Sequence, residues 1–240
     1  AYLKPAAVGT TQAGDAFGSS VAVSGETVVV GASREDSSTT GINSVADEIS
    51  ANSGAAYVFV RSGTTWSQQA YLKPASVGST QEGDNFGGSV GLAVDTLVVG
   101  AVSEDSSTTG VDSAANEFAS FSGAAYVFAR SSSNWSQQTY LKAGNSEASD
   151  IFGAVATSAN TVIVEGSATT WPIACSRCER PNRVKSGMLS DSVDQNPIMA
   201  VTLGTKTGQN SPNVWNLPSS RKDQMYNLRL LSSTQRLFGM

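Results

Sequence analysis

The sequence predicts an all-β protein built from repeats, and three observations lead to this prediction. The segment Tyr2-Leu3-Lys4-Pro5 returns as Tyr71-Leu72-Lys73-Pro74, and Trp66-Ser67-Gln68-Gln69 returns as Trp135-Ser136-Gln137-Gln138, both with a period of 69 residues. Apolar β-forming residues fall in four short runs within each period. Gly, Ser, Asn and Asp bound those runs. Such a period indicates that each copy is one supersecondary unit that buries its apolar surface against its neighbours.

Four antiparallel strands are expected in each repeat. Tight turns at residues 24–26 and 62–64 join the first two strands and the last two as hairpins. The run Val28-Val29-Val30 is apolar throughout, so the second strand is expected to be covered on both faces. A strand of that kind belongs in a sheet that lies between two other sheets. In the first copy the strands are placed at residues 17–24, 27–32, 55–61 and 66–72.

The period divides the chain into four segments. We expect two full repeats at residues 1–69 and 70–138, a partial third repeat at 139–166, and a divergent tail at 167–240. Arg is frequent in the tail, whose apolar run at 198–203 could supply a strand that the third repeat lacks. The run at 225–231 could supply another strand, although it also fits a helix. A foreign fusion or a change of reading frame would also explain the abrupt boundary.

The composition excludes several classes of function. The chain contains no histidine, which removes the Ser-His-Asp and Cys-His arrangements and imidazole metal sites. The net charge is −5, and Lys and Arg are sparse before residue 150, so a basic groove for nucleic acid is not expected. No apolar run reaches the roughly 20 residues of a membrane span. Cys175 and Cys178 lack a second pair or a histidine, so we expect a local disulfide or free thiols rather than zinc.

A short glycine-aspartate motif opens each copy. Gly14-Asp15-Ala16-Phe17-Gly18 returns as Gly83-Asp84-Asn85-Phe86-Gly87 and, in a weaker form, as Ser149-Asp150-Ile151-Phe152-Gly153. In the first two copies Gly-Ala-Ala-Tyr-Val-Phe follows further on. These motifs resemble the FG-GAP repeats of bacterial secreted and surface proteins, and the resemblance covers residues 1 to about 166. It implies four-stranded blades of a β-propeller, related to those of integrin α-subunits, in an incomplete ring.

The aromatic residues of the repeat are interpreted as packing residues. Phe17 and Phe86 are expected to be core anchors, and the Asp of the same motif is expected to accept backbone N–H bonds within a turn. The larger aromatic residues are assigned to packing between blades rather than to a sugar-binding platform. These residues are Trp66, Trp135, Tyr57 and Tyr126.

A long polar loop at residues 33–54 returns at 103–123. Within these loops, residues 36–41 and 105–110 keep the spacing of the Asp-x-Asp-x-Asp-Gly calcium loop, and the resemblance implies that some such repeats hold calcium. Hydroxyl groups replace the second and third carboxylates, and neighbouring acidic residues could restore the charge. The alternative is that these side chains form side-chain-to-backbone turns. The candidate ligands are Asp36, Ser38 and Thr40 in the first loop and Asp105, Ser107 and Thr109 in the second.

Three functions are considered. The resemblance implies a non-enzymatic binding or adhesion module, extracellular or at a cell surface, that binds a protein or a glycan and is stabilised by calcium. A structural subunit is the alternative, because too few blades to close a ring would leave sheet faces for other copies to cover, giving a homo-oligomer or a filament. A hydrolase would use Glu35 with Asp36 or Glu104 with Asp105, but duplication of the pair favours architecture over one active site, so we expect no enzyme.

Overall fold

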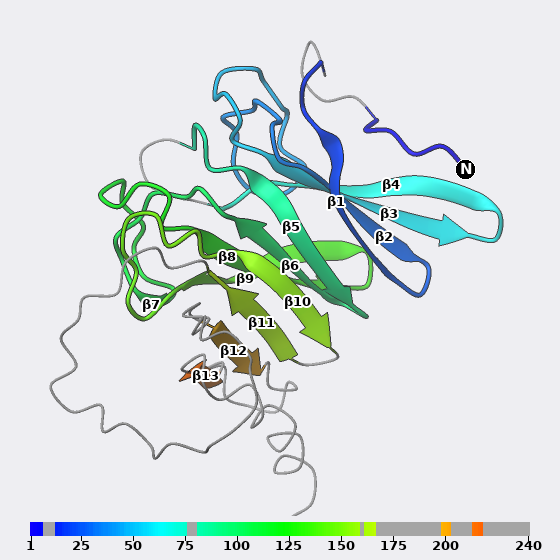
Figure 1. Cartoon of the computed structure of the whole chain (residues 1–240). Coiled ribbons are helices and arrows are strands. Elements are labelled where there is room, and N and C mark those ends of the chain that lie inside the picture. Colours follow the sequence, from blue (N-terminus) through cyan, green and yellow to red (C-terminus); the bar gives the residue numbers. More distant parts are fainter. Residues whose placement is uncertain (7–12, 76–80, 159–160, 167–197, 203–212, 218–240) are drawn as a thin grey trace, which may run out of the picture.

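The computed structural model describes residues 1–6, 13–75, 81–158, 161–166, 198–202 and 213–217. These residues form strands and no helix, and the strands pair antiparallel into three sheets (Figure 1). The predicted all-β class is therefore confirmed.

The first sheet contains the four strands predicted for the first repeat. Its order is β1 (Phe17–Ser24), β2 (Thr27–Ala32), β3 (Ala55–Ser62) and β4 (Thr65–Leu72). The ends differ from the predicted ends by at most one residue. The register between β1 and β2 shifts between Phe17 and Ser20, where the glycine-aspartate motif passes into the strand.

The second sheet repeats the first with one addition. The bulge of β1 returns between Phe86 and Ser89. The loop before β8 also runs back along the far edge of the sheet, where Val111 pairs with Leu141. This edge strand is two residues long, too short to be recognised as a strand in the sequence. The sheet order is β5 (Phe86–Ala93), β6 (Thr96–Ala101), β8 (Ala124–Ser131), β9 (Asn134–Lys142) and β7 (Gly110–Val111).

The third sheet combines the partial third repeat with two strands from the tail. Its order is β10 (Ala154–Ser158), β11 (Thr161–Glu165), β12 (Ile198–Thr202) and β13 (Asn213–Leu217). Strand β12 comes from the apolar run predicted at 198–203, whereas β13 is not predicted by its short sequence. The run at 225–231 and both cysteines lie outside the described residues. The repeat limits at 69, 138 and 166 stay a prediction, because the sheets are defined by pairing and not by the period.

The three sheets lie face to face in a series that does not close into a ring (Figure 1). Strand β5 of the middle sheet contacts β1 on one side and β10 on the other. The arrangement is that of successive propeller blades, each covered by its neighbour.

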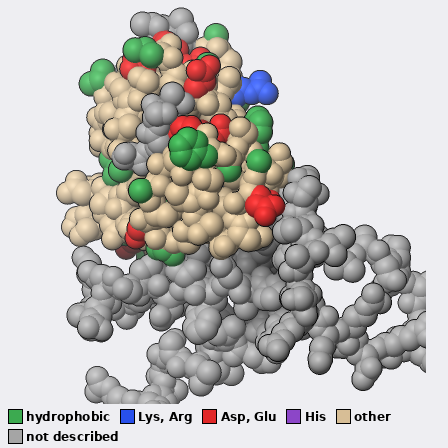
Figure 2. All heavy atoms as spheres, turned by 90° about the vertical axis from the view of Figure 1, so that its left-hand side faces the viewer, with side chains coloured by type: hydrophobic (Ala, Val, Ile, Leu, Met, Phe, Trp, Pro, Cys, Tyr) green, Lys and Arg blue, Asp and Glu red, His purple; other side chains and the backbone are tan. Residues whose placement is uncertain are grey.

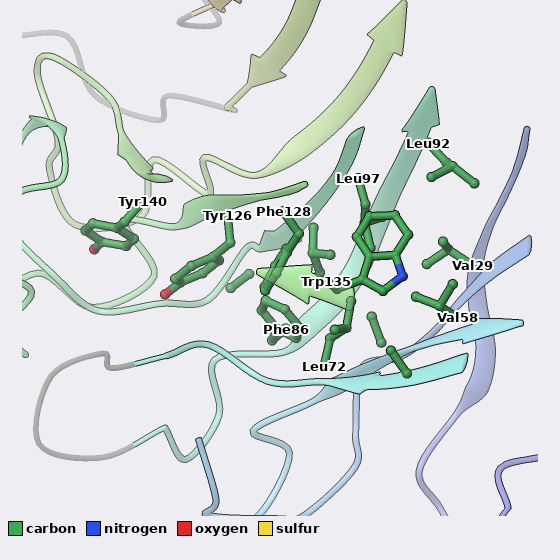
Figure 3. Packing of buried hydrophobic residues seen from close by; sticks show 14 of the residues in the cluster. Val29, Val58, Leu72, Phe86, Leu92, Leu97, Tyr126, Phe128, Trp135 and Tyr140 are labelled. Atoms are coloured by element: carbon green, nitrogen blue, oxygen red, sulfur yellow. The ribbon is translucent and has the colours of Figure 1, made fainter. Parts of the chain in front are cut away.

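Apolar side chains fill the space between the first and second sheets (Figure 3). Val29 and Val58 of the first sheet meet Leu92, Leu97 and Trp135 of the second. The other side of β2 is also buried, since Val30 packs in a separate cluster with Tyr57 and Tyr71. Residues of the same sheet provide this burial, and Val28 beside Val30 is only half-buried. Among the described residues, the expected position between two other sheets is found for the second sheet and not for the first. A third cluster joins the second sheet to Phe152, Val162 and Val164 of the third.

Aromatic residues hold the same places in both complete repeats. Phe17 meets the edge of Tyr57 at 5.5 Å between ring centroids, and Phe86 meets Tyr126 at 5.4 Å. Phe86 is fully buried, which confirms it as a core anchor, whereas Phe17 is only half-buried. Trp135 lies between the sheets and donates its indole N–H to Gln69 Oε1 of the first sheet at 2.9 Å.

Candidate interaction loops

The long loops lead from β2 to β3 and from β6 to β8 within one sheet, and their backbones hydrogen-bond to the repeat that follows. The N–H groups of Gly83, Asn85 and Phe86 donate to the carbonyls of Ala51, Asn52 and Ser53 at 2.9, 3.0 and 3.0 Å. One repeat later, Ser149, Ile151 and Phe152 donate to Ser120, Phe121 and Ser122 at 2.8, 2.9 and 3.0 Å. All six bonds run from the glycine-aspartate motif of one repeat to the loop of the repeat before it.

Side-chain hydrogen bonds hold each loop in one shape. In the first loop, Ser37 Oγ accepts the N–H of Asp47 at 3.1 Å and shares a hydrogen bond of 2.8 Å with Thr39 Oγ1. In the second loop, Ser106 Oγ accepts the N–H of Asn116 at 3.1 Å and pairs with Thr108 Oγ1 at 2.8 Å. Because the same bonds occur in both loops, the loop shape is a property of the repeat.

The first predicted calcium ligand of each loop accepts a backbone N–H group of the same loop. Asp36 Oδ1 accepts the N–H of Asn52, and Asp105 Oδ1 accepts the N–H of Phe121, both at 2.7 Å. A carboxylate used in this way closes the loop over sixteen residues.

The predicted Ser ligands donate hydrogen bonds to side chains of their own loops. Ser38 Oγ donates to Asp47 Oδ2 at 2.8 Å, and Ser107 Oγ donates to Asn116 Oδ1 at 3.2 Å. Thr40 and Thr109 are exposed. Within the described ranges, no three Asp, Glu, Cys or His side chains form a group that could hold a metal ion. The turn-forming alternative accounts for these hydrogen bonds, and calcium binding stays a prediction.

A buried ammonium lies beneath each loop. Lys73 Nζ donates to Glu35 Oε2 at 3.1 Å, to Ser53 Oγ at 2.7 Å and to the Gly54 carbonyl at 2.7 Å. The Lys side chain is fully buried, and these three bonds use all of its donors. The network ties the end of β4 to both ends of the long loop.

The second repeat contains the same network at positions 69 residues further on. Lys142 Nζ donates to Glu104 Oε2, Ser122 Oγ and the Gly123 carbonyl, each at 2.7 Å. Tyr140 donates its hydroxyl to Glu104 Oε1 at 2.7 Å, as Tyr71 does to Glu35 Oε1 at 2.9 Å.

Burial and the ion pair act in opposite directions on the Lys of each network. Burial lowers the pKa of Lys73 and of Lys142, and the facing carboxylates of Glu35 and Glu104 oppose that change. Burial also raises the pKa of Tyr71 and Tyr140, so both hydroxyls stay protonated as donors. Sequence reasoning missed this network, since it weighed Glu35 and Glu104 only as sources of calcium charge or as hydrolase carboxylates.

The adjacent carboxylates considered for a hydrolase do not face one another. Glu35 is buried against Lys73 and Tyr71, whereas Asp36 is bound to the backbone of Asn52. Glu104 and Asp105 are separated in the same way. Each carboxylate therefore has a structural partner in both repeats.

The Asp residues of the glycine-aspartate motif are buried in all three copies. Asp150 Oδ2 accepts the N–H of Glu147 at 2.8 Å, which is the expected turn role. Burial raises the pKa of Asp84 to about 8, and the carboxylates of Glu104 and Glu117 add to the rise. Burial, with Glu35 and other carboxylates, raises the pKa of Asp15 to about 6.

Several large apolar side chains on the loops are exposed to solvent, a feature that the sequence analysis did not predict. Phe118 is 85% exposed and Phe121 is 55% exposed. Figure 2, which faces the side where β7 lies in Figure 1, shows apolar and acidic side chains next to one another and few basic ones. We call this set of exposed apolar residues the loop face; it consists of Val45, Ile49, Phe118, Phe121 and Ile151.

A comparison with family models matches residues 10–59 and 66–128 to the FG-GAP repeat. These two segments are FG-GAP repeats. The recognised family is thereby confirmed for the first two copies, and the third copy lies beyond the matched residues. A search of the curated proteins found no match. Among the residues that the structure describes, no helix is long and apolar enough to cross a membrane.

The first prediction concerns the buried ion pair of the second FG-GAP repeat. Glu104→Gln leaves the Lys142 ammonium buried without a charged partner, and we expect the free energy of unfolding to fall by about 3–5 kcal/mol. Urea unfolding followed by Trp fluorescence measures the change. Glu26→Gln, which breaks the exposed pair with Arg61, is the control and should lower the free energy of unfolding far less, because solvent screens an exposed ion pair. Equal losses for the two variants would contradict the structural role of the network.

The second prediction concerns pH. The pKa of Asp84 is about 8 in the folded state and 3.8 without the fold, so the folded state binds the proton more tightly. Stability from this group is therefore greatest at low pH, falls as pH rises from about 4 to about 8 and is constant above that. Asp84→Asn should flatten this slope, by up to about 1.4 kcal/mol per pH unit, in urea unfolding between pH 5 and pH 8. Glu82→Gln, an exposed neighbour, should keep the slope; a slope unchanged in Asp84→Asn would refute the assignment.

Proposed function

We propose that this protein is a non-enzymatic binding module, acting outside the cell or at its surface, whose recognition surface is the loop face. One observation carries the proposal: large apolar side chains are exposed on loops whose backbones are held by hydrogen bonds. Exposed apolar groups gathered on one face of a soluble domain mark sites of interaction. The loops of repeat proteins, which fall on one side of the sheets, are suited to this role.

The two exposed Phe residues contrast with the others that the structure describes. Phe59, Phe86, Phe128 and Phe152 are buried, and Phe17 is half-buried. Folding therefore places most aromatic area in the core and leaves Phe118 and Phe121 outside it. Aromatic side chains of this kind dominate the energy of many interfaces.

The backbone beneath the exposed side chains is fixed before any partner arrives. The N–H of Phe118 donates to Asn116 Oδ1 at 3.1 Å, and the N–H of Phe121 donates to Asp105 Oδ1 at 2.7 Å. In the first loop the N–H of Ile49 donates to Asp47 Oδ1 at 3.2 Å. Because the loops are already ordered, binding loses little conformational entropy, and more of the contact energy appears as affinity.

Two residues of the loop face adopt backbone conformations that side chains avoid. Phe121 has φ of 57° and Ile151 has φ of 51°, in the left-handed region where β-branched residues are rare. The Phe121 carbonyl accepts the N–H of Ile151, so the pair is locked together across two repeats. Conformations of this kind cluster at functional sites, where the surrounding structure maintains them.

The charge around the loop face indicates the chemistry of the partner. Residues 1–166 contain sixteen acidic and six basic side chains, and two of the basic ones are the buried Lys73 and Lys142. Complementary charge steers association and suppresses wrong partners. A protein surface that combines apolar side chains with Lys or Arg fits this face best, and a glycan is the second candidate ligand.

A non-enzymatic role is consistent with the state of the carboxylates. Glu35 and Glu104 are neutralised by Lys and are closed off from solvent, and Asp36 and Asp105 accept backbone N–H groups. A glycosidase needs two carboxyl groups that flank one substrate bond. The paired carboxylates of this protein are instead parts of a framework that recurs in each repeat.

The third prediction tests the loop face. We expect the protein to bind a member of an array of purified extracellular-matrix proteins and cell-surface glycans. The double variant Phe118→Ser, Phe121→Ser should bind at least about tenfold more weakly, since losing an aromatic hot spot costs more than about 1 kcal/mol. Val94→Ser is the matched control, because Val94 is also exposed with a positive φ but lies in the β5–β6 turn, away from the loops. Unchanged binding by the double variant, equal loss in the control, or no binding by the native protein would each count against the proposal.

The fourth prediction concerns calcium. Because Asp36, Ser38, Asp105 and Ser107 already have hydrogen-bond partners, we propose that the loops are held without a metal ion. The midpoint of thermal unfolding should then be the same in millimolar calcium and in chelator. Calcium at ten times its Kd would add about 1.4 kcal/mol per site and raise the midpoint by about 3 °C or more. A rise of that size that Asp36→Asn reduces would restore calcium to these loops.

A further inference from the structure

One face of the first sheet has no sheet packed against it in the described part of the chain. We call it the open face and define it by Phe17, Val21, Val23, Val28 and Trp66. Val23 is 67% exposed, although Leu92, its counterpart in the second sheet, is 8% exposed beneath the first sheet. The open face is therefore built like a face that another blade covers.

Three other residues of the open face show the same contrast with their counterparts. Phe86, Leu97 and Trp135 are buried in the cluster between the sheets (Figure 3). Their counterparts Phe17, Val28 and Trp66 are only half-buried. The apolar pattern is therefore kept in the first repeat, where these side chains pack only against their own sheet and its loops in the described part of the chain.

The backbone at the open face has N–H groups whose counterparts bind a preceding loop. In the second and third repeats, three N–H groups of the glycine-aspartate motif donate to carbonyls of the preceding loop. The equivalent donors in the first repeat are the N–H groups of Gly14, Ala16 and Phe17. Within residues 13–75 and the other described segments, none of them donates to a carbonyl of a preceding loop.

A close contact between glycines adds a steric requirement. The Gly87 carbonyl packs on Gly31 so tightly that a Cβ on Gly31 would overlap it, and the Gly153 carbonyl packs on Gly100 in the same way. Ser20 Oγ donates to the same Gly87 carbonyl at 2.7 Å. Gly18, the counterpart of Gly87, has open space around it. Whatever covers Gly18 must present a residue without a Cβ.

We propose that the open face binds a complete FG-GAP blade from outside these 240 residues. Such a blade presents Gly at the position of Gly31 and a face of small apolar residues like that of Val29 and Val58. Its long loop supplies three carbonyls like those of Ala51, Asn52 and Ser53. The interface repeats the one between the first and second sheets, so its geometry is already defined within the molecule.

The segment Tyr2-Leu3-Lys4 supports the same occupant. It repeats Tyr71-Leu72-Lys73, the end of a fourth strand with its buried ammonium. Tyr2 is 84% exposed and Lys4 is exposed, whereas Tyr71 and Lys73 are buried against Glu35. The segment would form the end of the incoming blade's fourth strand, with Lys4 donating to that blade's Glu and Ser.

A second copy of this chain does not meet the steric requirement. The faces of its first and second sheets that contain Gly31 and Gly100 are already covered within the same chain. In its third sheet Glu165 stands where the other sheets have Gly31 and Gly100. The Cβ of that Glu would overlap the Gly18 carbonyl of the first copy. The homo-oligomer expected from the sequence therefore has no fitting partner surface at the open face.

The fifth prediction uses the full chain with an added copy of residues 1–69 joined ahead of Ala1, which reproduces the junction at Ala70. Hydrogen exchange followed by mass spectrometry should show at least tenfold slower exchange at Gly14, Ala16 and Phe17 than in the unextended chain. The matched control is the same extension with Gly31→Glu in the added copy, which imitates Glu165 and should give no protection. Protection that is absent in the first extension, or equal in both, would overturn the proposal.

A second variant keeps the test independent of how well the added copy folds. Val23→Lys alters only an exposed residue of the open face, so the unextended chain should fold normally, and the extended chain should lose the protection. Sedimentation of the unextended chain should show no association that Val23→Lys abolishes; such an association would replace the proposed blade with a second copy. The inference does not rest on the loop face, and Phe118→Ser should leave the protection unchanged.

Discussion

The buried ion pair of each repeat is the interaction on which the other features depend. Lys73 and Glu35 are far apart in sequence, and their contact joins the end of the fourth strand to the end of the second. Through Ser53 and Gly54 the same ammonium also fixes the start of the third strand. A long loop with both ends held in this way can be polar and still rigid, and its carbonyls are placed where the next repeat needs them.

The loops consequently have two roles that use different atoms. Their backbone carbonyls face the following sheet and hold it in register, while their exposed side chains face solvent. Substitution on the solvent side leaves the inter-sheet bonds intact, because those bonds involve only main-chain atoms. Ile49 in the first loop and Phe118 in the second occupy the same position with different side chains, which illustrates this freedom.

The sequence predicted the strands well because the alternation of apolar residues and the turn residues recur in register in both copies. It did not predict the role of Lys73, since a Lys at a strand end is usually exposed; its place between Leu72 and Pro74 in a repeated motif was the available signal. The loop residues were ambiguous for a physical reason. Asp, Ser and Thr at alternate positions offer the same oxygen atoms to a cation as to backbone N–H groups, so spacing alone does not separate Asp36 as a ligand from Asp36 as a turn residue.

The six main-chain hydrogen bonds between the glycine-aspartate motifs and the preceding loops all have donors in the later repeat and acceptors in the earlier one. The series of sheets therefore has a direction, and its first and last described sheets present different surfaces. Glu165 stands at the position that Gly31 and Gly100 hold in the first two sheets, whereas Gly18, the counterpart of Gly87, has open space around it. Under the proposed interface a matching blade therefore packs on the Gly18 side, and the Glu165 side chain opposes the same packing at the other end of the series.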